Sequence, residues 1–349
     1  MAQLAIEIGF DKIRACVAIG RDIHKVPLGS ISSPYEFPPI AVKLQTGYVF
    51  GNVAKLCAVS SPDSTVFLYD YLRQKTVQRE TIIALLNTIK ERVTEIYKVA
   101  VDSIALVTPP YFKDILQSRF LDGCIDSVSN RTDVKNSSIS FCRSFLNIRV
   151  GQRVLLLDFR DNPAYASIIL RGARSYDAIG ASSIEDFSTT DCENFIEDKI
   201  LSNYATHLFP EEEIMAAWIQ GNIASNITQD AIQKLLFGKN IKYEIPFTVG
   251  AISISQSEFQ NWLLPKLDKI CDGIIGYVRE VGLSLADFSQ IVVFGGVFES
   301  QFVRDRIERF LSGYNQEIRF SYFTAPMDEW MICESVLTNN FNSVYALEL

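Results

Sequence analysis

Two similar segments of the 349-residue chain constrain its fold most strongly. In each, an apolar stretch carries an acidic residue, Glu7 or Asp158, toward a tight turn, and a second apolar stretch runs back beside the first. These stretches are residues 4–9 and 14–19 in the first segment, and residues 154–159 and 165–170 in the second. Short apolar runs separated by turn residues are typical of buried strands that pair in a hairpin. Two such hairpins predict two related lobes that face each other across a cleft.

Composition restricts the class of protein. A hydrophobic content of 48% is enough to build a core for each of two domains. The net charge of -8 and the absence of a Lys/Arg run argue against a nucleic-acid partner or a membrane-attracting patch. The apolar stretches have the length of strands, and residues 1–8 lack the pattern of a signal peptide. We therefore expect a cytoplasmic protein without a nucleic-acid or membrane partner.

The cysteines and histidines argue against several kinds of site. The seven cysteines are scattered and include no Cys-x-x-Cys pair, so we expect buried thiols rather than a disulfide framework or a zinc site. A histidine-based site would need His24 or His207, because the chain has no other histidine. A lone histidine is more often structural, and we expect no such site here.

Periodicity and turn residues predict the elements around the hairpins. Ser255-x-x-Glu258 is a capping box that opens a long helix, whose apolar stripe runs from Phe259 to Val281. A buried strand at 290–294 ends at Gly295-Gly296 before a helix over 300–311. The other predicted elements are a hairpin at 40–50, a helix at 81–97, a strand at 103–108 leading into a helix that opens at Pro109, helices at 194–207 and 229–237, and a strand pair at 242–247 and 249–254.

The order of these elements resembles the ATPase domain of the 70-kDa heat-shock chaperones, in the actin, sugar-kinase and heat-shock superfamily. The matches run from about residue 4 to residue 345. They are Ile6-Glu7-Ile8-Gly9 with Cys16-Val17 (first phosphate loop), Phe50 to Lys55 (the "GDAAK" turn), Val107 to Phe112 (the "TVPAYF" crossover), Leu155 to Asp158 (second phosphate strand), Ile291 to Gly296 (the adenosine motif "IVLVGG"), and Ala325-Pro326 to Val336 (terminal connecting helix).

The resemblance implies an α/β protein with a two-lobed actin-like ATPase fold, a duplicated ribonuclease H-like unit with a central cleft. Lobe I is expected at 1–151 with a small subdomain at about 35–100, and lobe II at 152–325 with a small subdomain at about 188–262. Residues 326–349 are expected to form a helix that packs back toward lobe I. With Leu349 as the natural terminus, the peptide-binding domain of those chaperones is missing.

The same resemblance implies that ATP or ADP binds with magnesium between the lobes. By position, the nucleotide-binding residues are Glu7, Gly9, Asp158, Arg160, Asp230, Lys234, Gly295 and Gly296, with Glu7 and Asp158 organising the magnesium through water. A different reading is that Glu7 and Asp158 are relics hydrogen-bonded to neighbouring backbone, and that Asp230 and Lys234 are a solvated i,i+4 pair.

The phosphate loops depart from the family pattern. The threonines of the first loop are replaced by Phe10 and Asp11, and a carboxylate ~4 Å from phosphate costs ~4 kcal/mol at an effective dielectric near ~20. In the second loop, Asp158 to Pro163 replaces the run Asp, Leu, Gly, Gly, Gly, Thr, and Pro163 has no N–H. Arg160 could still hold a phosphate.

The catalytic positions of the family are changed as well. The catalytic lysine aligns near Asp70, and the catalytic glutamate aligns with Phe141-Cys142-Arg143. The glycine pair of the second lobe aligns with Ser188-Thr189, and Glu299 follows the Gly295-Gly296 turn in place of an arginine. A site that lacks the catalytic lysine, the catalytic glutamate and the glycine-rich phosphate loop together is predicted to give no useful ATP hydrolysis.

Three functions stay open at the level of sequence. The first is a non-hydrolysing binding or regulatory module with weak or no adenine-nucleotide affinity and an unidentified protein partner. The second is a slow magnesium-dependent ATPase or small-molecule kinase that uses Asp158 as base and Arg160 in place of the lysine. The third is a purely structural interaction partner, whose cleft is filled by Phe10 and its neighbours.

Overall fold

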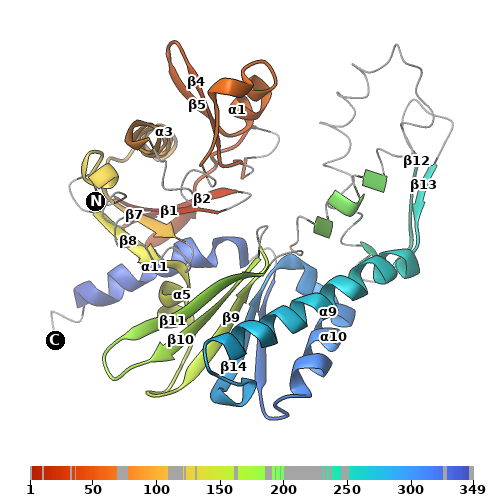
Figure 1. Ribbon diagram of the computed structural model, residues 1–349. Coiled ribbons are helices and arrows are strands. Elements are labelled where there is room, and N and C mark those ends of the chain that lie inside the picture. Colours follow the sequence, from red (N-terminus) through yellow and green to blue (C-terminus); the bar gives the residue numbers. More distant parts are fainter. Residues whose placement is uncertain are drawn as a thin grey trace. The chain divides into compact units, whose positions relative to one another are not determined.

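The computed structural model describes an α/β protein with two mixed five-stranded sheets (Figure 1). The chain divides into two compact units, one of residues 1–156, 167–181 and 327–349, the other of 157–166 and 182–326. The described residues are 2–9, 12–31, 34–35, 37–68, 78–108, 121, 123–129, 132–160, 164–184, 191–192, 194–196, 198–199, 231, 234–235, 238–244, 251–324 and 328–345.

The first sheet has the strand order β3-β2-β1-β7-β8. The predicted first hairpin is confirmed, because β1 and β2 pair antiparallel, with Ala5 opposite Cys16. β1 is parallel to β7, and β7 is parallel to β8. The strands are β1 (Ala2–Ile8), β2 (Ile13–Ile19), β3 (Asp22–Lys25), β7 (Val101–Thr108) and β8 (Thr132–Asn136).

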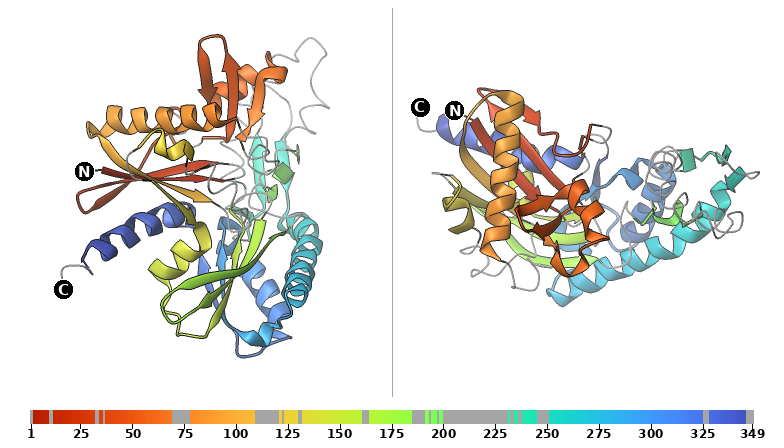
Figure 2. Two further views of the ribbon diagram at one scale, coloured as in Figure 1. Left: turned by 60° about the vertical axis from the view of Figure 1, so that its left-hand side comes forward. Right: turned by 90° about the horizontal axis from the view of Figure 1, so that it is seen from above.

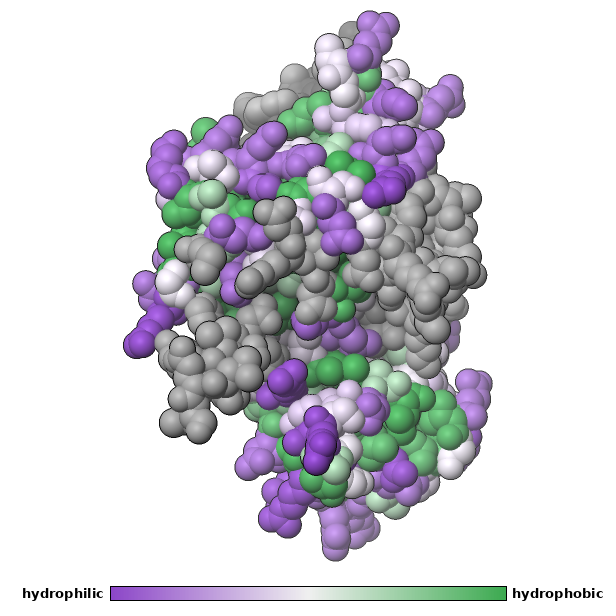
Figure 3. Space-filling model, turned by 90° about the vertical axis from the view of Figure 1, so that its left-hand side faces the viewer, coloured by the Kyte–Doolittle hydropathy of each residue, from purple (hydrophilic) through white to green (hydrophobic). Residues whose placement is uncertain are grey.

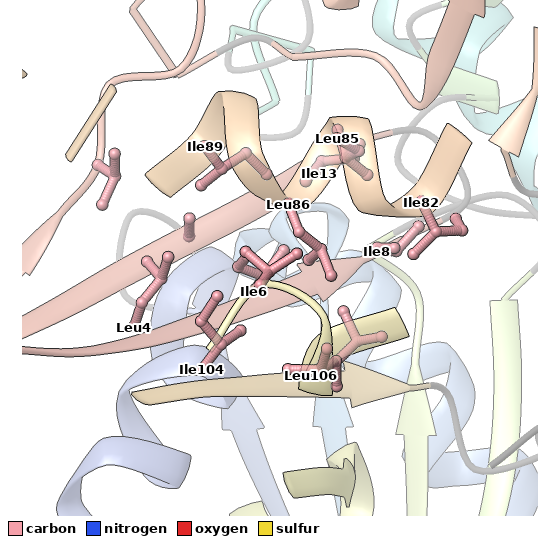
Figure 4. Close-up of a cluster of buried hydrophobic side chains, with 14 of the residues drawn as sticks. Leu4, Ile6, Ile8, Ile13, Ile82, Leu85, Leu86, Ile89, Ile104 and Leu106 are labelled. Atoms are coloured by element: carbon pink, nitrogen blue, oxygen red, sulfur yellow. The ribbon is translucent and has the colours of Figure 1, made fainter. Parts of the chain in front are cut away.

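Helix α3 (Arg79–Tyr97) covers one face of this sheet and confirms the helix predicted at 81–97. Alternate side chains of a strand point to the same face, so Leu4, Ile6 and Ile8 of β1 meet the helix together. Figure 4 shows them below the apolar stripe of α3, with Ile104 and Leu106 of β7 completing the layer. Burial of these apolar side chains holds helix and sheet together.

Helices α5 (Ser137–Phe145) and α11 (Asp328–Tyr345) pack on the other face of the first sheet. Figure 2 shows α3 and α11 on opposite sides of the strands. The side chain of Asn136 caps α5 by accepting a hydrogen bond from the N–H of Ile139 at 3.0 Å. Helix α11 contacts α5, β1, β2 and β7, and Ser144 of α5 donates to the carbonyl of Ser335 at 2.9 Å.

A small three-stranded sheet, β5-β4-β6, follows β3 in the chain. The hairpin predicted at 40–50 is confirmed, since β4 and β5 pair antiparallel. Helix α1 packs against both strands and buries Ala54 between itself and the sheet. The elements are β4 (Ile40–Leu44), β5 (Gly47–Phe50), α1 (Gly51–Ala58), the 3₁₀ helix η1 (Pro62–Ser64) and β6 (Thr65–Phe67).

The second sheet has the order β11-β10-β9-β14-β15, and β14 pairs parallel with β15. When the strands of each sheet are numbered along the chain, both sheets read 3-2-1-4-5. The second predicted hairpin corresponds to the neighbouring strands β9 and β10. The strands are β9 (Arg153–Asp158), β10 (Ala164–Arg171), β11 (Tyr176–Ile184), β14 (Phe288–Phe294) and β15 (Arg319–Phe323).

Helix α9 (Gln256–Glu280) begins where the capping box predicted, because Ser255 Oγ accepts from the N–H of Glu258 at 3.1 Å. Its apolar stripe is buried from Phe259 to Val278, but the prediction was wrong for Val281, which lies past the last helical residue and is 39% exposed. Helix α9 packs against α10 (Gln301–Ser312), where Arg306 Nη2 contacts Asp268 Oδ2 at 2.7 Å.

The remaining elements of the second half are short. β12 (Ile241–Glu244) and β13 (Ala251–Ile254) pair antiparallel as predicted, and the 3₁₀ helices are η4 (Leu285–Asp287) and η5 (Gly296–Glu299). The helix predicted after Pro109 and most of those predicted at 194–207 and 229–237 lie outside the described residues.

The surface and the cysteines of the described residues can be compared with what the composition predicts. Hydrophilic and hydrophobic residues are interspersed on the face drawn in Figure 3. Among the described helices, we find none that is both long and apolar enough to cross a bilayer. All seven cysteines are free thiols and six are buried, with Cys57 half-buried, as the scattered spacing predicted.

Candidate functional site

The end of strand β9 carries a buried acidic residue that is held by its own hairpin. Asp158 accepts hydrogen bonds from Arg160, at 3.0 Å from the backbone N–H and 2.9 Å from Nε to Oδ1, and at 2.6 Å from Nη2 to Oδ2. The two side chains are each 2% exposed. The residue two positions after the acid therefore supplies the counter-charge that a buried carboxylate requires.

Tyr165, on the returning strand β10, completes this arrangement. Its hydroxyl donates to Asp158 Oδ2 at 2.6 Å, and the side chain is buried. Each carboxylate oxygen then accepts at least two hydrogen bonds, and an ionised carboxylate offers about four acceptor positions in all. The carboxylate of Asp158 is thus saturated by Arg160 and Tyr165, and a magnesium-bound water would have to displace one of them.

The Gly295 turn, where the resemblance puts adenosine, packs directly on the residue next to Asp158. The N–H of Phe159 donates to the carbonyl of Phe294 at 2.9 Å. A Cβ added to Gly295 would lie 3.1 Å from Cβ of Phe159, and the φ of +137° at Gly295 is one that L side chains rarely adopt. Glycine is therefore required at position 295 by backbone geometry and by contact with Phe159.

Aromatic side chains surround this turn. The ring of Phe159 lies 5.0 Å from that of Phe298, which lies 5.9 Å from that of Tyr322. The Arg304 guanidinium lies over Tyr322 at 4.8 Å, and its Nε donates to the carbonyl of Phe298. Phe159 and Phe298 are fully buried. Described protein side chains therefore occupy the inner side of the Gly295-Gly296 turn, while Gly296 itself is half-buried.

The acid of the first hairpin has a similar neighbour. Glu7 of β1 lies directly opposite Arg14 of β2, so the two side chains leave the same face of the sheet. Both are buried, Glu7 at 4% and Arg14 at 1% exposure. Gly9 closes the turn by donating its N–H to the carbonyl of Lys12 at 2.9 Å. A buried arginine thus faces the candidate magnesium-organising acid here too.

The other predicted site residues are placed in part. Lys234 is half-buried, and its carbonyl accepts from the N–H of Lys239 at 2.8 Å. Asp230 lies outside the described residues, so the predicted pairing of Asp230 with Lys234 stays a prediction. Also outside are the loop residues Phe10, Asp11, Asp161, Asn162 and Pro163, and the aligned positions Asp70, Ser188 and Thr189.

At the aligned position of the catalytic base, α5 presents no carboxylate. Phe141 and Cys142 are buried there and Arg143 is exposed. Burial raises the pKa of the Cys142 thiol to about 12, which makes it a poor base or nucleophile at neutral pH. His24 lies against the ring of Tyr97 at 5.5 Å, a packing contact. Within the described residues, no group of three His, Cys, Asp or Glu side chains could hold a metal ion.

Sequence reasoning missed two residues that bear on the site, Arg14 and Tyr165. Their roles depend on strand register, because Arg14 is opposite Glu7 and Tyr165 reaches back to Asp158 from the returning strand. The available signal was the hairpin itself: a tight turn brings the residues just after it next to the acid just before it. A search for protein families and for similar curated proteins found no match to this chain.

Proposed function

We propose that this chain is a non-catalytic relative of the heat-shock ATPase domains that serves as a binding or regulatory module for a protein partner. In this proposal its affinity for adenine nucleotide is weak or absent. The observation that carries it is the occupation of Asp158 by Arg160 and Tyr165 inside a buried hairpin. An internal cation takes the place that a magnesium-nucleotide complex would need.

The fold-level part of the proposal is a duplicated ribonuclease H-like unit, as in the actin-like ATPases. Its support is the repeated strand order 3-2-1-4-5 in the two sheets, and the acid at or next to the end of the first strand of each, Glu7 in β1 and Asp158 in β9. In both halves the third and fourth strands are separated by an inserted small sheet and a long helix, β4-β5-β6 with α3 and β12-β13 with α9. Fold alone does not assign activity, so the functional part depends on the site.

Electrostatics explains why the internal pair opposes polyphosphate chemistry. Magnesium needs carboxylate or water oxygens in near-octahedral geometry. The guanidinium of Arg160 neutralises Asp158 from within hydrogen-bonding distance, and it lies over the Phe294 ring, 5.8 Å from the ring centroid. To release the carboxylate, the protein would have to leave a buried guanidinium without its partner, which is strongly unfavourable.

The test is nucleotide binding and turnover by the purified chain. Titration calorimetry with ADP and ATP, each with and without magnesium, should show no saturation below roughly 1 mM nucleotide. Thermal denaturation with the same ligands should show no shift beyond that of an inert polyanion such as tripolyphosphate. ATP turnover should equal the rate without protein.

A matched pair of variants makes this test decisive. Asp158→Asn removes the candidate base, whereas Asp268→Asn removes a half-exposed acid paired with Arg306 on α9. Magnesium-dependent turnover that is lost in Asp158→Asn and kept in Asp268→Asn overturns the proposal in favour of a slow ATPase or kinase. Micromolar nucleotide binding without turnover retains the regulatory module but rejects Arg160 as a barrier to nucleotide.

A further inference from the structure

A pair of buried thiols joins the first hairpin to the last helix. Cys16 lies in β2 and Cys333 in α11, and both side chains are 0% exposed. Helix α11 packs on β2, and the Cys333 Sγ donates to the carbonyl of Arg14 at 3.6 Å. Because Leu4 and Ile6 of β1 face α3, Ala5 and its cross-strand partner Cys16 point to the opposite face, which α11 covers.

The two thiols are also neighbours. The Cys16 side chain contributes to the raised pKa of the buried Cys333 thiol, and both are free thiols rather than a disulfide. Cys16 and Cys333 lie near opposite ends of the sequence, so they are neighbours only because α11 is docked on the first sheet. We propose that Cys16 and Cys333 are a latent disulfide site, whose oxidation fastens α11 covalently to β2.

The chemistry needs an oxidant, and hydrogen peroxide is one that suffices. One thiol, as thiolate, attacks a peroxide oxygen, the O–O bond breaks, and a sulfenic acid and water result. The second thiol then attacks that sulfur, the S–O bond breaks, and the second oxygen leaves as water. In total two thiols lose two electrons and two protons, and one peroxide becomes two waters.

The burial of the two thiols determines when they can be oxidised. Burial, together with the neighbouring thiol of Cys16, raises the pKa of Cys333 well above its usual range, so little thiolate exists while α11 is docked. Oxidation therefore requires α11 to separate transiently from β2, and re-docking brings the sulfurs together again. The amount of disulfide formed therefore increases with the number of times that α11 separates from β2. This inference does not depend on the proposed function.

The experiment compares reduced protein with protein treated with hydrogen peroxide, using non-reducing peptide mapping by mass spectrometry. We expect a peptide pair linking Cys16 to Cys333, formed faster at urea concentrations below the unfolding transition. The oxidised protein should melt higher by roughly 5 °C or more, because the bond closes a very long loop, and reducing agent should reverse the shift.

Two variants serve as controls. Cys57→Ser removes the half-buried thiol on α1 and should keep both the link and the shift. Cys333→Ser should lose both, and the mapping of the unmodified chain decides the question even where this variant fails to fold. The proposal is overturned by oxidation of Cys57 without a 16–333 link, or by a link from either thiol to Cys142 instead.

Discussion

The two hairpins that begin the sheets place a buried arginine next to their acids by different routes. In the first sheet Arg14 faces Glu7 across the strand pair, whereas in the second sheet Arg160 follows Asp158 by two residues and binds it through backbone and side chain. The first arrangement depends on strand register and the second is local. A short-range ion pair stays formed as long as its own turn persists, so we expect the second hairpin to be the more rigid of the two.

The helices around the two sheets differ as well. Helix α11 follows β15 of the second sheet in the chain, yet it packs on β1, β2 and β7 of the first. Trp330 at its start is buried and meets Lys25 of β3 and Tyr35. The face of the first sheet opposite α3 is therefore covered only when α11, from the last part of the chain, packs on it. The stability of the first sheet should depend on α11 more than that of the second sheet does.

The largest loss in the free energy of unfolding is expected for Asp158→Asn. The change leaves the buried guanidinium of Arg160 without its counter-charge, which costs about 3–5 kcal/mol for such pairs. Urea denaturation measures the loss in the free energy of unfolding. The matched variant Asp268→Asn breaks a pair whose members are 36% and 37% exposed, and should cost no more than about 1 kcal/mol. Equal costs for the two would contradict a special role for the hairpin pair.

Glu7→Gln makes the corresponding change in the first hairpin. Removing the charge opposite Arg14 should cost about 1–3 kcal/mol, the range for a buried polar group deprived of a partner. The exposed Glu91 on α3 provides a control, since Glu91→Gln should stay within about 0.5 kcal/mol. A cost as large as that of Asp158→Asn would show that the register-dependent arrangement is as strong as the local one.

Gly295→Ala tests the turn at the end of β14. The added Cβ meets Phe159 at 3.1 Å with a φ of +137°, so we expect a loss of about 1–3 kcal/mol. Gly273→Ala in α9 is the control, because a Cβ there has open space and an alanine favours the helix by about 0.5–1 kcal/mol. Thermal denaturation of the two variants should shift in opposite directions, and a tolerated Gly295→Ala would mean that Phe159 moves aside.

The pH dependence of the free energy of unfolding tests the buried Cys142 thiol of α5. Burial raises the Cys142 pKa from about 9 in the unfolded chain to about 12, so the fold favours the neutral thiol. Its contribution to stability is complete below about pH 9 and decreases by about 1.4 kcal/mol per pH unit up to about pH 12. Cys142→Ala should flatten the alkaline decline in urea-unfolding free energy, while Cys57→Ser leaves it steep.

How much could be predicted from the sequence depended on how local each signal was. The first hairpin, the helix at 81–97 and the Ser255 cap follow from periodicity and capping residues near one another in the chain, and the structure confirms them. Strands β8 and β15 were not predicted, because each joins its sheet by parallel pairing with a strand far from it in sequence. The site residues Arg14 and Tyr165 were missed for a different reason: both belong to the predicted hairpins, but only the strand register shows which residue of the returning strand lies beside the acid.

The smallest expected effect compares two helix starts in the second half of the chain. Ser255 caps α9 through its hydroxyl, whereas Ser300 begins α10 without a side-chain cap. Ser255→Ala should therefore cost about 1 kcal/mol, measured by urea denaturation, because the N–H of Glu258 loses its acceptor. Ser257→Ala, two residues further on, is the control and should cost less, because it removes only an exposed hydroxyl that lies 3.0 Å from Ser255 Oγ and leaves the cap acceptor in place. A neutral Ser255→Ala would mean that packing of the buried stripe from Phe259 to Val278 alone fixes the start of α9.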